Sequence, residues 1–187
     1  MTASPAYHSR LMSDGLPAFV DPLRLADAGR SIAGRLPVHR FRRLAEVLAE
    51  VSGEVEVALT FERETPARAI VVGSVRADLW LVCQRCLEPV AVTLDLPVRL
   101  TVVRSEAEAE RLDEGDEPLI VEEQPIPLVE LVEDEILLAL PQVPMHPWSV
   151  CGQRVEAARL RRETELPTSP FAALEALRGR RNQREEP

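Results

Sequence analysis

The sequence predicts an α+β fold, with a mainly antiparallel β-sheet or partial barrel, two to three flanking helices and an extended C-terminal tail. Two observations lead to this prediction. Apolar and polar residues alternate over much of residues 54–100, which is the period of half-buried strands. Apolar residues recur at helical spacing after Pro37 and again after Pro127. The 187 residues suffice for one domain with appendages.

Short elements are expected before the alternating region. Residues 16–20 predict a short strand, and residues 23–28 a helical turn or short helix. Pro37 suits the first turn of a longer helix, because its missing N–H has no partner there in any case. Gly53 is expected to end that helix.

The alternating region predicts consecutive strands joined by short turns, which is typical of an antiparallel sheet. We expect strands over residues 55–61, 69–72, 75–81 and 90–100. Pro97 cannot donate to a strand ladder, so the last of these strands should lie at an edge or bend there.

The second half begins with an acidic surface loop over residues 104–118 and continues into a helix that starts after Pro127 and ends at Pro141. We therefore expect three parts along the chain. They are a core α+β domain over residues 1–151, a linker or weak helix over 152–168, and a short C-terminal helix with a basic tail over 169–187.

Composition narrows the classes of partner. The net charge of −9 argues against general binding of nucleic acid, which usually needs a basic face, and favours a basic protein partner. No apolar run approaches the length of a membrane span, and the first residues do not resemble a secretory signal. We expect a cytoplasmic protein with no membrane partner, whose cysteines are reduced thiols or metal ligands.

Three cysteines and one histidine form the candidate metal site. Cys83 and Cys86 are spaced to bind one ion, and His146 with Cys151 would complete a tetrahedral zinc site. Such a site carries one net negative charge, which Arg85 would offset. Two alternatives stay open: buried thiols at a strand end without metal, and a thiol-redox pair.

The helix after Pro127 carries a cluster of carboxylates. Helical spacing places Glu130, Glu133 and Asp134 on one exposed surface, whereas Glu135 falls nearer the apolar side, where it is expected to anchor an internal arginine. Compensation of the helix dipole accounts for one or two acids in the first turn. The acids continue into the second turn, which favours a basic partner.

Several of these motifs together resemble the YceD family, the large ribosomal RNA subunit accumulation proteins of bacteria and plastids. The similarity runs from about Leu16 to Arg181. It rests on the segments Asp21–Arg24, Cys83–Cys86, Leu131–Pro141, Pro144 with His146, and Pro170–Phe171.

The resemblance implies a non-enzymatic factor that supports synthesis, processing or stability of 23S rRNA and assembly of the large ribosomal subunit. Family genes often neighbour the gene of a small basic large-subunit protein. The expected partner is therefore a large-subunit ribosomal protein or a pre-ribosomal particle, with rRNA contacted indirectly and no small-molecule substrate. The residues expected to bind it are Arg85, Glu130, Glu133, Asp134 and Glu135.

The sequence differs from the usual family pattern at two places, and two alternative functions stay open. Similar proteins often carry a second Cys-x-x-Cys downstream, where this chain has Cys151–Gly152, and Leu87 stands where many zinc knuckles have Gly. One alternative is a direct rRNA-binding protein that uses Arg85, Arg99 and the tail 178–184. The other is a zinc-dependent or thiol-redox enzyme.

Overall fold

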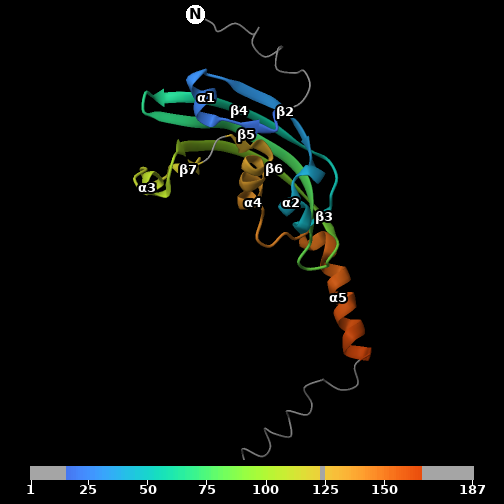
Figure 1. The fold of residues 1–187 in the computed structure, drawn as a ribbon. Coiled ribbons are helices and arrows are strands. Elements are labelled where there is room, and N and C mark those ends of the chain that lie inside the picture. Colours follow the sequence, from blue (N-terminus) through green and yellow to red (C-terminus); the bar gives the residue numbers. More distant parts are fainter. Residues whose placement is uncertain (1–15, 123–124, 166–187) are drawn as a thin grey trace, which may run out of the picture. The chain divides into compact units, whose positions relative to one another are not determined.

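The computed structural model describes residues 16–122 and 125–165 of the chain. The chain divides into two compact units, one ending at Met145 and the other beginning at His146. The first unit has the predicted α+β fold, in which an open six-stranded sheet, a separate two-stranded sheet and several helices share one hydrophobic core (Figure 1).

Three long strands form the centre of the main sheet. They are β4 (Glu54–Thr65), β5 (Arg68–Val82) and β6 (Pro89–Val103), and they pair as an antiparallel meander. The predicted alternation is confirmed, because every second residue from Val55 to Phe61 is buried and the residues between them are more exposed. The two expected strands at 69–72 and 75–81 are a single strand, β5.

Shorter strands complete the sheet at its margins. Strand β2 (Ser31–Pro37) pairs with β4, and β3 (Leu48–Glu50) pairs with the end of β5. Strand β7 (Glu117–Ile120) joins β6 in parallel, which is the exception to the antiparallel pattern. Strand β7 pairs only with the last residues of β6, Leu100–Val103. Within the described part of the sheet, Pro97 therefore has no neighbouring strand on the β7 side, which suits a residue that has no N–H to donate.

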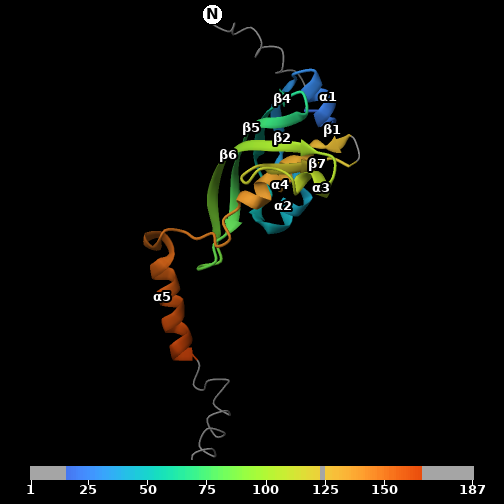
Figure 2. The same ribbon diagram turned by 90° about the vertical axis from the view of Figure 1, so that its left-hand side faces the viewer.

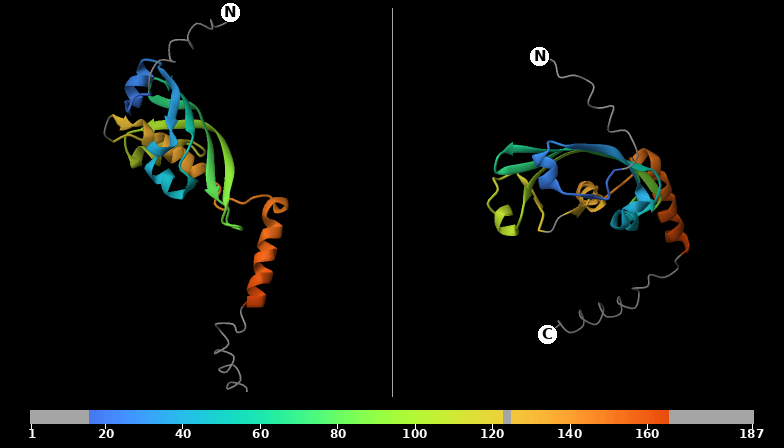
Figure 3. Two further views of the ribbon diagram at one scale, coloured as in Figure 1. Left: turned by 90° about the vertical axis from the view of Figure 1, so that its right-hand side faces the viewer. Right: turned by 45° about the horizontal axis from the view of Figure 1, so that its top comes forward.

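The sheet is strongly curved, and its concave face holds the core (Figure 3). Gly73 lies in the middle of β5, opposite Leu59 of β4 and Val98 of β6. A Cβ atom at this position would collide with the carbonyl oxygen of Ala58. The close approach of two strand backbones at Gly73 therefore requires glycine, a common device where a sheet bends tightly.

Helix α4 (Leu128–Ala139) lies in the hollow of the sheet. Its apolar stripe is buried against β5 and β6; the fully or nearly buried residues are Leu128, Leu131, Val132 and Ile136. The first N–H of α4 donates to the carbonyl of Ala18, 3.1 Å away, just before β1 (Phe19–Val20), which pairs with β8 (Ile126–Pro127). The small β1–β8 sheet thus holds the entry to α4.

Helix α2 (Arg42–Val47) packs beside α4 on the same side of the sheet (Figure 2). The prediction of one long helix from Pro37 to Gly53 is wrong, because a 3-10 turn at Val38–Arg40 precedes α2 and strand β3 follows it. Phe41 and Leu44 are fully buried, as their helical spacing predicts. The helix ends where Leu48 can pair with Leu81 of β5.

Two further helices belong to the first unit. Helix α1 (Pro22–Asp27) corresponds to the short helix expected at residues 23–28, and Asp21 caps it by accepting from the N–H of Arg24. Helix α3 (Glu106–Ala109) is a single turn inside the acidic loop, capped by Ser105.

The described part of the second unit contains one helix, α5 (Trp148–Glu165). It covers most of the stretch expected as a linker or weak helix. The C-terminal helix and basic tail expected over 169–187 lie outside the described residues. Within the described residues, no helix is long and apolar enough to span a membrane.

Candidate functional site

The turn between β5 and β6 is a tight loop, here called the knuckle loop, Cys83–Glu88. The N–H of Cys83 donates to the carbonyl of Glu88, and the N–H of Leu87 donates back to the carbonyl of Cys83, each over 2.9 Å. The N–H of Gln84 donates to Pro144, also over 2.9 Å, so the loop is held to the segment that follows α4. These bonds fix the direction in which the thiols of the loop point.

Leu87 occupies the position where many zinc knuckles have glycine, and its backbone explains why glycine is usual there. Its φ is 62°, and among the described residues it is the one non-glycine with a positive φ. Leucine in this conformation costs roughly 1–2 kcal/mol. The knuckle geometry is therefore kept even though the residue does not favour it.

The structure brings the four predicted metal ligands together. The Sγ atoms of Cys83, Cys86 and Cys151 and a ring nitrogen of His146 all lie within 4.8 Å of one another. Zn–S bonds of about 2.3 Å in a tetrahedral site place two sulfurs about 3.8 Å apart, so the donor atoms need only small shifts to bind one ion. Cys83 and Cys151 are buried, and Cys86 and His146 are partly exposed. This three-cysteine, one-histidine group can therefore hold a metal ion.

Arg85 lies within the knuckle loop, between the two cysteines. One of its terminal nitrogens lies 3.4 Å from the sulfur of Met145. Arg99, a residue of β6 that was also considered for RNA binding, pairs with Glu64 over 2.6 Å on the face of the sheet opposite the core. Its charge is thus already balanced within the protein.

Glu133 is not on an exposed surface, contrary to the prediction. Only 3% of the residue is accessible, and both carboxylate oxygens are used. Oε1 accepts from the backbone N–H of Leu44 over 3.0 Å, and Oε2 accepts from Nε of Arg43 over 2.8 Å. Asp134 accepts from the same guanidinium over 2.7 Å. We call this arrangement the Glu133 clamp.

The clamp caps helix α2 from a different helix. The first turn of any helix leaves N–H groups without intrahelical partners. The N-cap residue of α2 is Phe41, whose side chain has no oxygen to offer. Glu133 supplies that acceptor from α4, and its charge also complements the N-terminal end of the α2 dipole. The structure therefore gives an arginine partner to Glu133 and not, as expected, to Glu135, and that arginine, Arg43, is half exposed and not internal.

Glu135 lies instead among other acids. It is partly buried on α4, and burial raises the pKa of its carboxyl, with further contributions from the charges of Glu117 and Asp134. Glu130 is exposed, one helical turn before Asp134. The structure thus divides the predicted acidic set. Glu133 lies inside the fold, Glu130 and Asp134 are exposed, and Glu135 is partly exposed.

The clamp gives a first prediction. Glu133→Ala leaves the Leu44 N–H buried without its acceptor, which should lower the free energy of unfolding by about 2 kcal/mol. For a chain of this size, that corresponds to a fall of about 4–8 °C in Tm. Glu133→Gln keeps one acceptor oxygen and should lose less. Thermal melting followed by circular dichroism measures both, and a loss from Glu133→Ala no larger than that from the exposed control Glu130→Ala would contradict the clamp.

A second prediction follows from the raised pKa of Glu135. Ionisation of this carboxyl is less favourable in the folded than in the unfolded protein. The protonated carboxyl of Glu135 therefore stabilises the folded state fully below the ordinary glutamate pKa of about 4.3. This stabilisation is lost as the pH rises through the raised pKa of the folded protein. Glu135→Gln should raise Tm at pH 7 and have little effect near pH 3.5. Melting curves across this range check it; an equal gain from Glu130→Gln, or a gain that persists at low pH, would count against it.

Comparisons with known proteins agree with the sequence motifs. A family model described as "Large ribosomal RNA subunit accumulation protein YceD" matches residues 71–178. A relative from Haemophilus influenzae with the same description is 34% identical over 167 residues, which cover 87% of this chain and 96% of the relative. No solved structure matches. The matched region contains the knuckle loop, α4 and both later metal ligands, and the chain belongs to the YceD family of large ribosomal RNA subunit accumulation proteins.

Proposed function

We propose that the protein supports accumulation of large-subunit rRNA by binding, without catalysis, a basic large-subunit ribosomal protein or an assembly intermediate that contains one. The family description supports the general role. The observation that carries the binding mode is the group of outward carboxylates on α4 and β7, here called the acidic surface: Glu117, Glu130, Asp134 and Glu135.

Three of these acids interact unfavourably in the free protein. Glu117 and Asp134 both disfavour the charged form of Glu135, and within the described residues only Asp134 is paired with an arginine. A basic side chain from a partner would relieve this repulsion when it binds. Complementary charge of this kind mainly raises the rate of association and makes binding sensitive to salt.

Arg85 and Glu133 have different places in this proposal. Glu133 positions the surface because its clamp orients α4 against α2. Arg85 belongs to the knuckle loop and would partly neutralise the negative charge of a three-thiolate metal site. We therefore assign direct partner contact to the acidic surface and not to these two residues.

The acidic surface predicts a specific loss of binding. A triple variant with Glu130→Gln, Asp134→Asn and Glu135→Gln removes three charges, keeps side-chain shape and leaves the clamp bond to Leu44 intact. It should fold and capture large-subunit proteins about tenfold less at low salt. The measurement is affinity capture from nuclease-treated cell extract, quantified by mass spectrometry.

A matched control removes three charges from the convex face of the sheet. The variant combines Glu54→Gln, Glu56→Gln and Asp95→Asn, which are exposed acids near Arg35 and Arg76. It should capture the same proteins as the wild type. Equal capture by the wild type and the α4 variant, or an equal loss in both variants, would refute the acidic surface.

We also propose that Cys83, Cys86, His146 and Cys151 bind Zn²⁺ in a closed structural site. The support is the donor set and its spacing: three thiols and an imidazole are typical of structural zinc sites. With four protein ligands no position is left for a reacting water, so the ion would stabilise structure and would not catalyse a reaction. Bound zinc would also offset the strained backbone of Leu87.

The zinc site predicts a metal content and a stability effect. Protein purified without chelator should contain about one zinc per chain, and His146→Ala should reduce that content while the exposed control His39→Ala does not. Chelator should lower the Tm of the wild type and not that of His146→Ala, because binding to the folded state alone stabilises it. Elemental analysis measures the zinc content, and melting curves measure the effect of chelator on Tm. If the protein contains no metal, all its thiols react with a titrating reagent and chelator leaves Tm unchanged, the cysteines are simply reduced thiols.

A further inference from the structure

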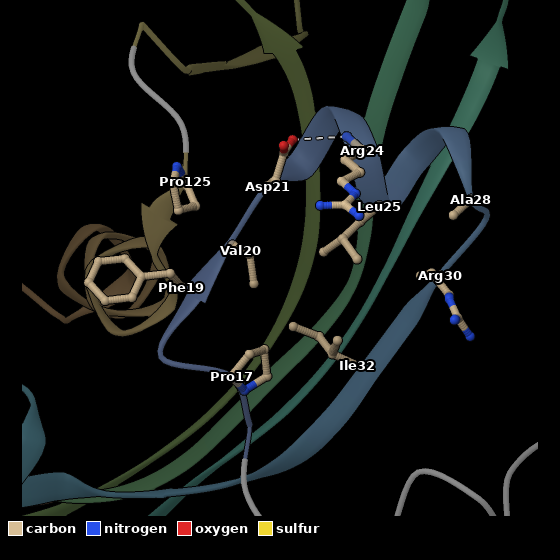
Figure 4. Close-up of a pocket in the computed structure, with 10 residues that line it drawn as sticks. All are labelled: Pro17, Phe19, Val20, Asp21, Arg24, Leu25, Ala28, Arg30, Ile32 and Pro125. Atoms are coloured by element: carbon tan, nitrogen blue, oxygen red, sulfur yellow. Dashed lines mark hydrogen bonds between the residues drawn. The ribbon is translucent and has the colours of Figure 1, made fainter.

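The first unit has a hollow of about 580 Å³ between β1, α1 and the start of β2, but its side chains do not converge on a ligand (Figure 4). The Phe19 ring points away from the hollow, on the opposite side of β1 from Val20, and Arg30 points outward. The hollow therefore does not form a binding site. An unpaired strand edge toward the opposite margin of the main sheet, in β6, has more to offer a partner.

Most of β6 has a neighbouring strand on one side only. Strand β5 pairs with Pro89–Val102, whereas β7 pairs only with Leu100–Val103. Figure 1 shows β7 beside one end of β6, with α4 on the concave side of the sheet. Among the described residues, no strand lies beside residues 89–99 on the β7 side. A strand edge of this length displays backbone N–H and C=O groups that can pair with another chain.

The backbone groups that point out from this edge follow from one hydrogen bond. The carbonyl of Val103 accepts from the N–H of Val121 over 2.8 Å, so Val103 points toward the β7 side. Successive residues of a strand direct their N–H and C=O groups to alternate sides, so the odd-numbered residues of β6 point outward. The position of Pro97 agrees, because a missing N–H on the inner side would break the ladder to β5. The outward N–H groups of the unpaired stretch belong to Ala91, Thr93, Asp95 and Arg99.

The hydrophobic core is incompletely covered along the same edge. Val92 and Leu96 face the concave side and are only half-buried, whereas Leu100 and Val102, beside β7, are buried. A strand laid along β6 would cover Val92 and Leu96. Leu138 of α4 is 84% accessible and lies three residues after Glu135, on the same side of the helix.

Two carboxylates lie at the β7 end of the unpaired edge. Glu117 is the first residue of β7 and lies opposite Leu100, so its side chain is on the concave face of the sheet. Glu135 of α4 is near enough for the charge of Glu117 to raise its pKa, although burial raises it more. Among the described residues, neither carboxylate forms an ion pair, and of the α4 acids nearby only Glu133 and Asp134 do. A strand that continues the line of β7 along β6 would therefore be favoured by a basic side chain at this end.

We propose that a short extended segment of the basic partner adds to the sheet as a strand along β6, hydrogen-bonded to Ala91, Thr93 and Asp95. Its apolar side chains cover Val92 and Leu96, and its lysine or arginine side chains reach Glu117 and Glu135. In strand addition of this kind, main-chain bonds give the affinity and alternate side chains give the selectivity. The inference rests on the proposed function and names how the partner of the acidic surface binds.

The test is fluorescence anisotropy of the full chain with two fluorescein-labelled peptides, Val-Thr-Val-Thr-Lys-Thr-Lys and its reverse sequence. Both carry the apolar and basic residues on one face of a strand, and they differ in which strand direction places the basic end at Glu117. At least one should bind, and its version with Glu in place of Lys should bind about tenfold more weakly. Of its two versions methylated at alternating backbone nitrogens, one should lose binding, because only one set of N–H groups faces β6.

Proline at position 93 tests the edge in the protein itself. Thr93→Pro removes an outward N–H and should leave the ladder to β5 intact, as the native Pro97 does. The change also removes the hydroxyl that donates to Asp78 over 2.6 Å, so the matched control is Thr93→Val, which loses the same hydroxyl and keeps the N–H. Thr93→Pro should bind the peptide about tenfold more weakly, and Thr93→Val should bind like the wild type. Should Thr93→Pro fail to fold by circular dichroism, Ala91→Pro with its control Ala91→Val carries the same test.

Amide hydrogen exchange locates the bound strand. In the free protein, the outward amides of Ala91, Thr93 and Asp95 should exchange faster than those of Val92 and Leu94, which face β5. Bound peptide should slow the three outward amides. If these amides are already protected without peptide, to a degree that rises with protein concentration, the edge pairs with a second copy of this chain and the proposal is wrong.

Two comparisons separate this proposal from the acidic surface itself. If Thr93→Pro captures large-subunit proteins like Thr93→Val while the α4 triple variant loses them, strand addition is wrong and the proposed function stands. If Thr93→Pro loses them and the α4 triple variant does not, the edge stands and the acidic surface is wrong. Failure of both peptides to bind, or equal peptide binding by the folded Thr93→Pro and Thr93→Val variants, would also overturn strand addition.

Discussion

The Glu133 clamp is the interaction on which the arrangement of α2, α4 and the acidic surface depends. A buried carboxylate is stable only when its charge is paired and its oxygens accept hydrogen bonds, and Glu133 meets both conditions through Arg43 and the Leu44 N–H. The same bonds fix α4 in the hollow of the sheet beside α2. The neighbouring acids on α4 are thereby turned toward solvent, so one short acidic motif serves both the fold and the surface.

Much of the sheet could be predicted because its central strands bury one face. Alternation from Val55 to Phe61 and along β5 and β6 is a direct consequence of that burial. Strand β2 was not predicted, since only Leu36 within it is fully buried and its alternation is faint. The long helix expected before Gly53 was wrong because pairing of Leu48 with β5 overrides the local helical pattern.

The candidate sites differ in how far the sequence could reveal them. Cysteines with Cys-x-x-Cys spacing allow few chemical uses, so the sequence could name the four donor side chains that lie together in the structure, while their binding of a metal stays a prediction. Glu133 and Arg43 are 90 residues apart, and helical spacing alone assigned the arginine partner to the wrong glutamate.

The central claim is that Glu133 caps α2 from inside the fold, and amide hydrogen exchange at Leu44 tests it most directly. Other amides in the first turn of α2 have no intrahelical acceptor and should exchange readily. The Leu44 amide, held by the buried Oε1 of Glu133, should exchange only when the protein opens, with protection near that of the amides in β5. Exchange of Leu44 as fast as that of Arg42 would show that the clamp is not formed in solution, and the assignment of the α4 carboxylates would then be wrong.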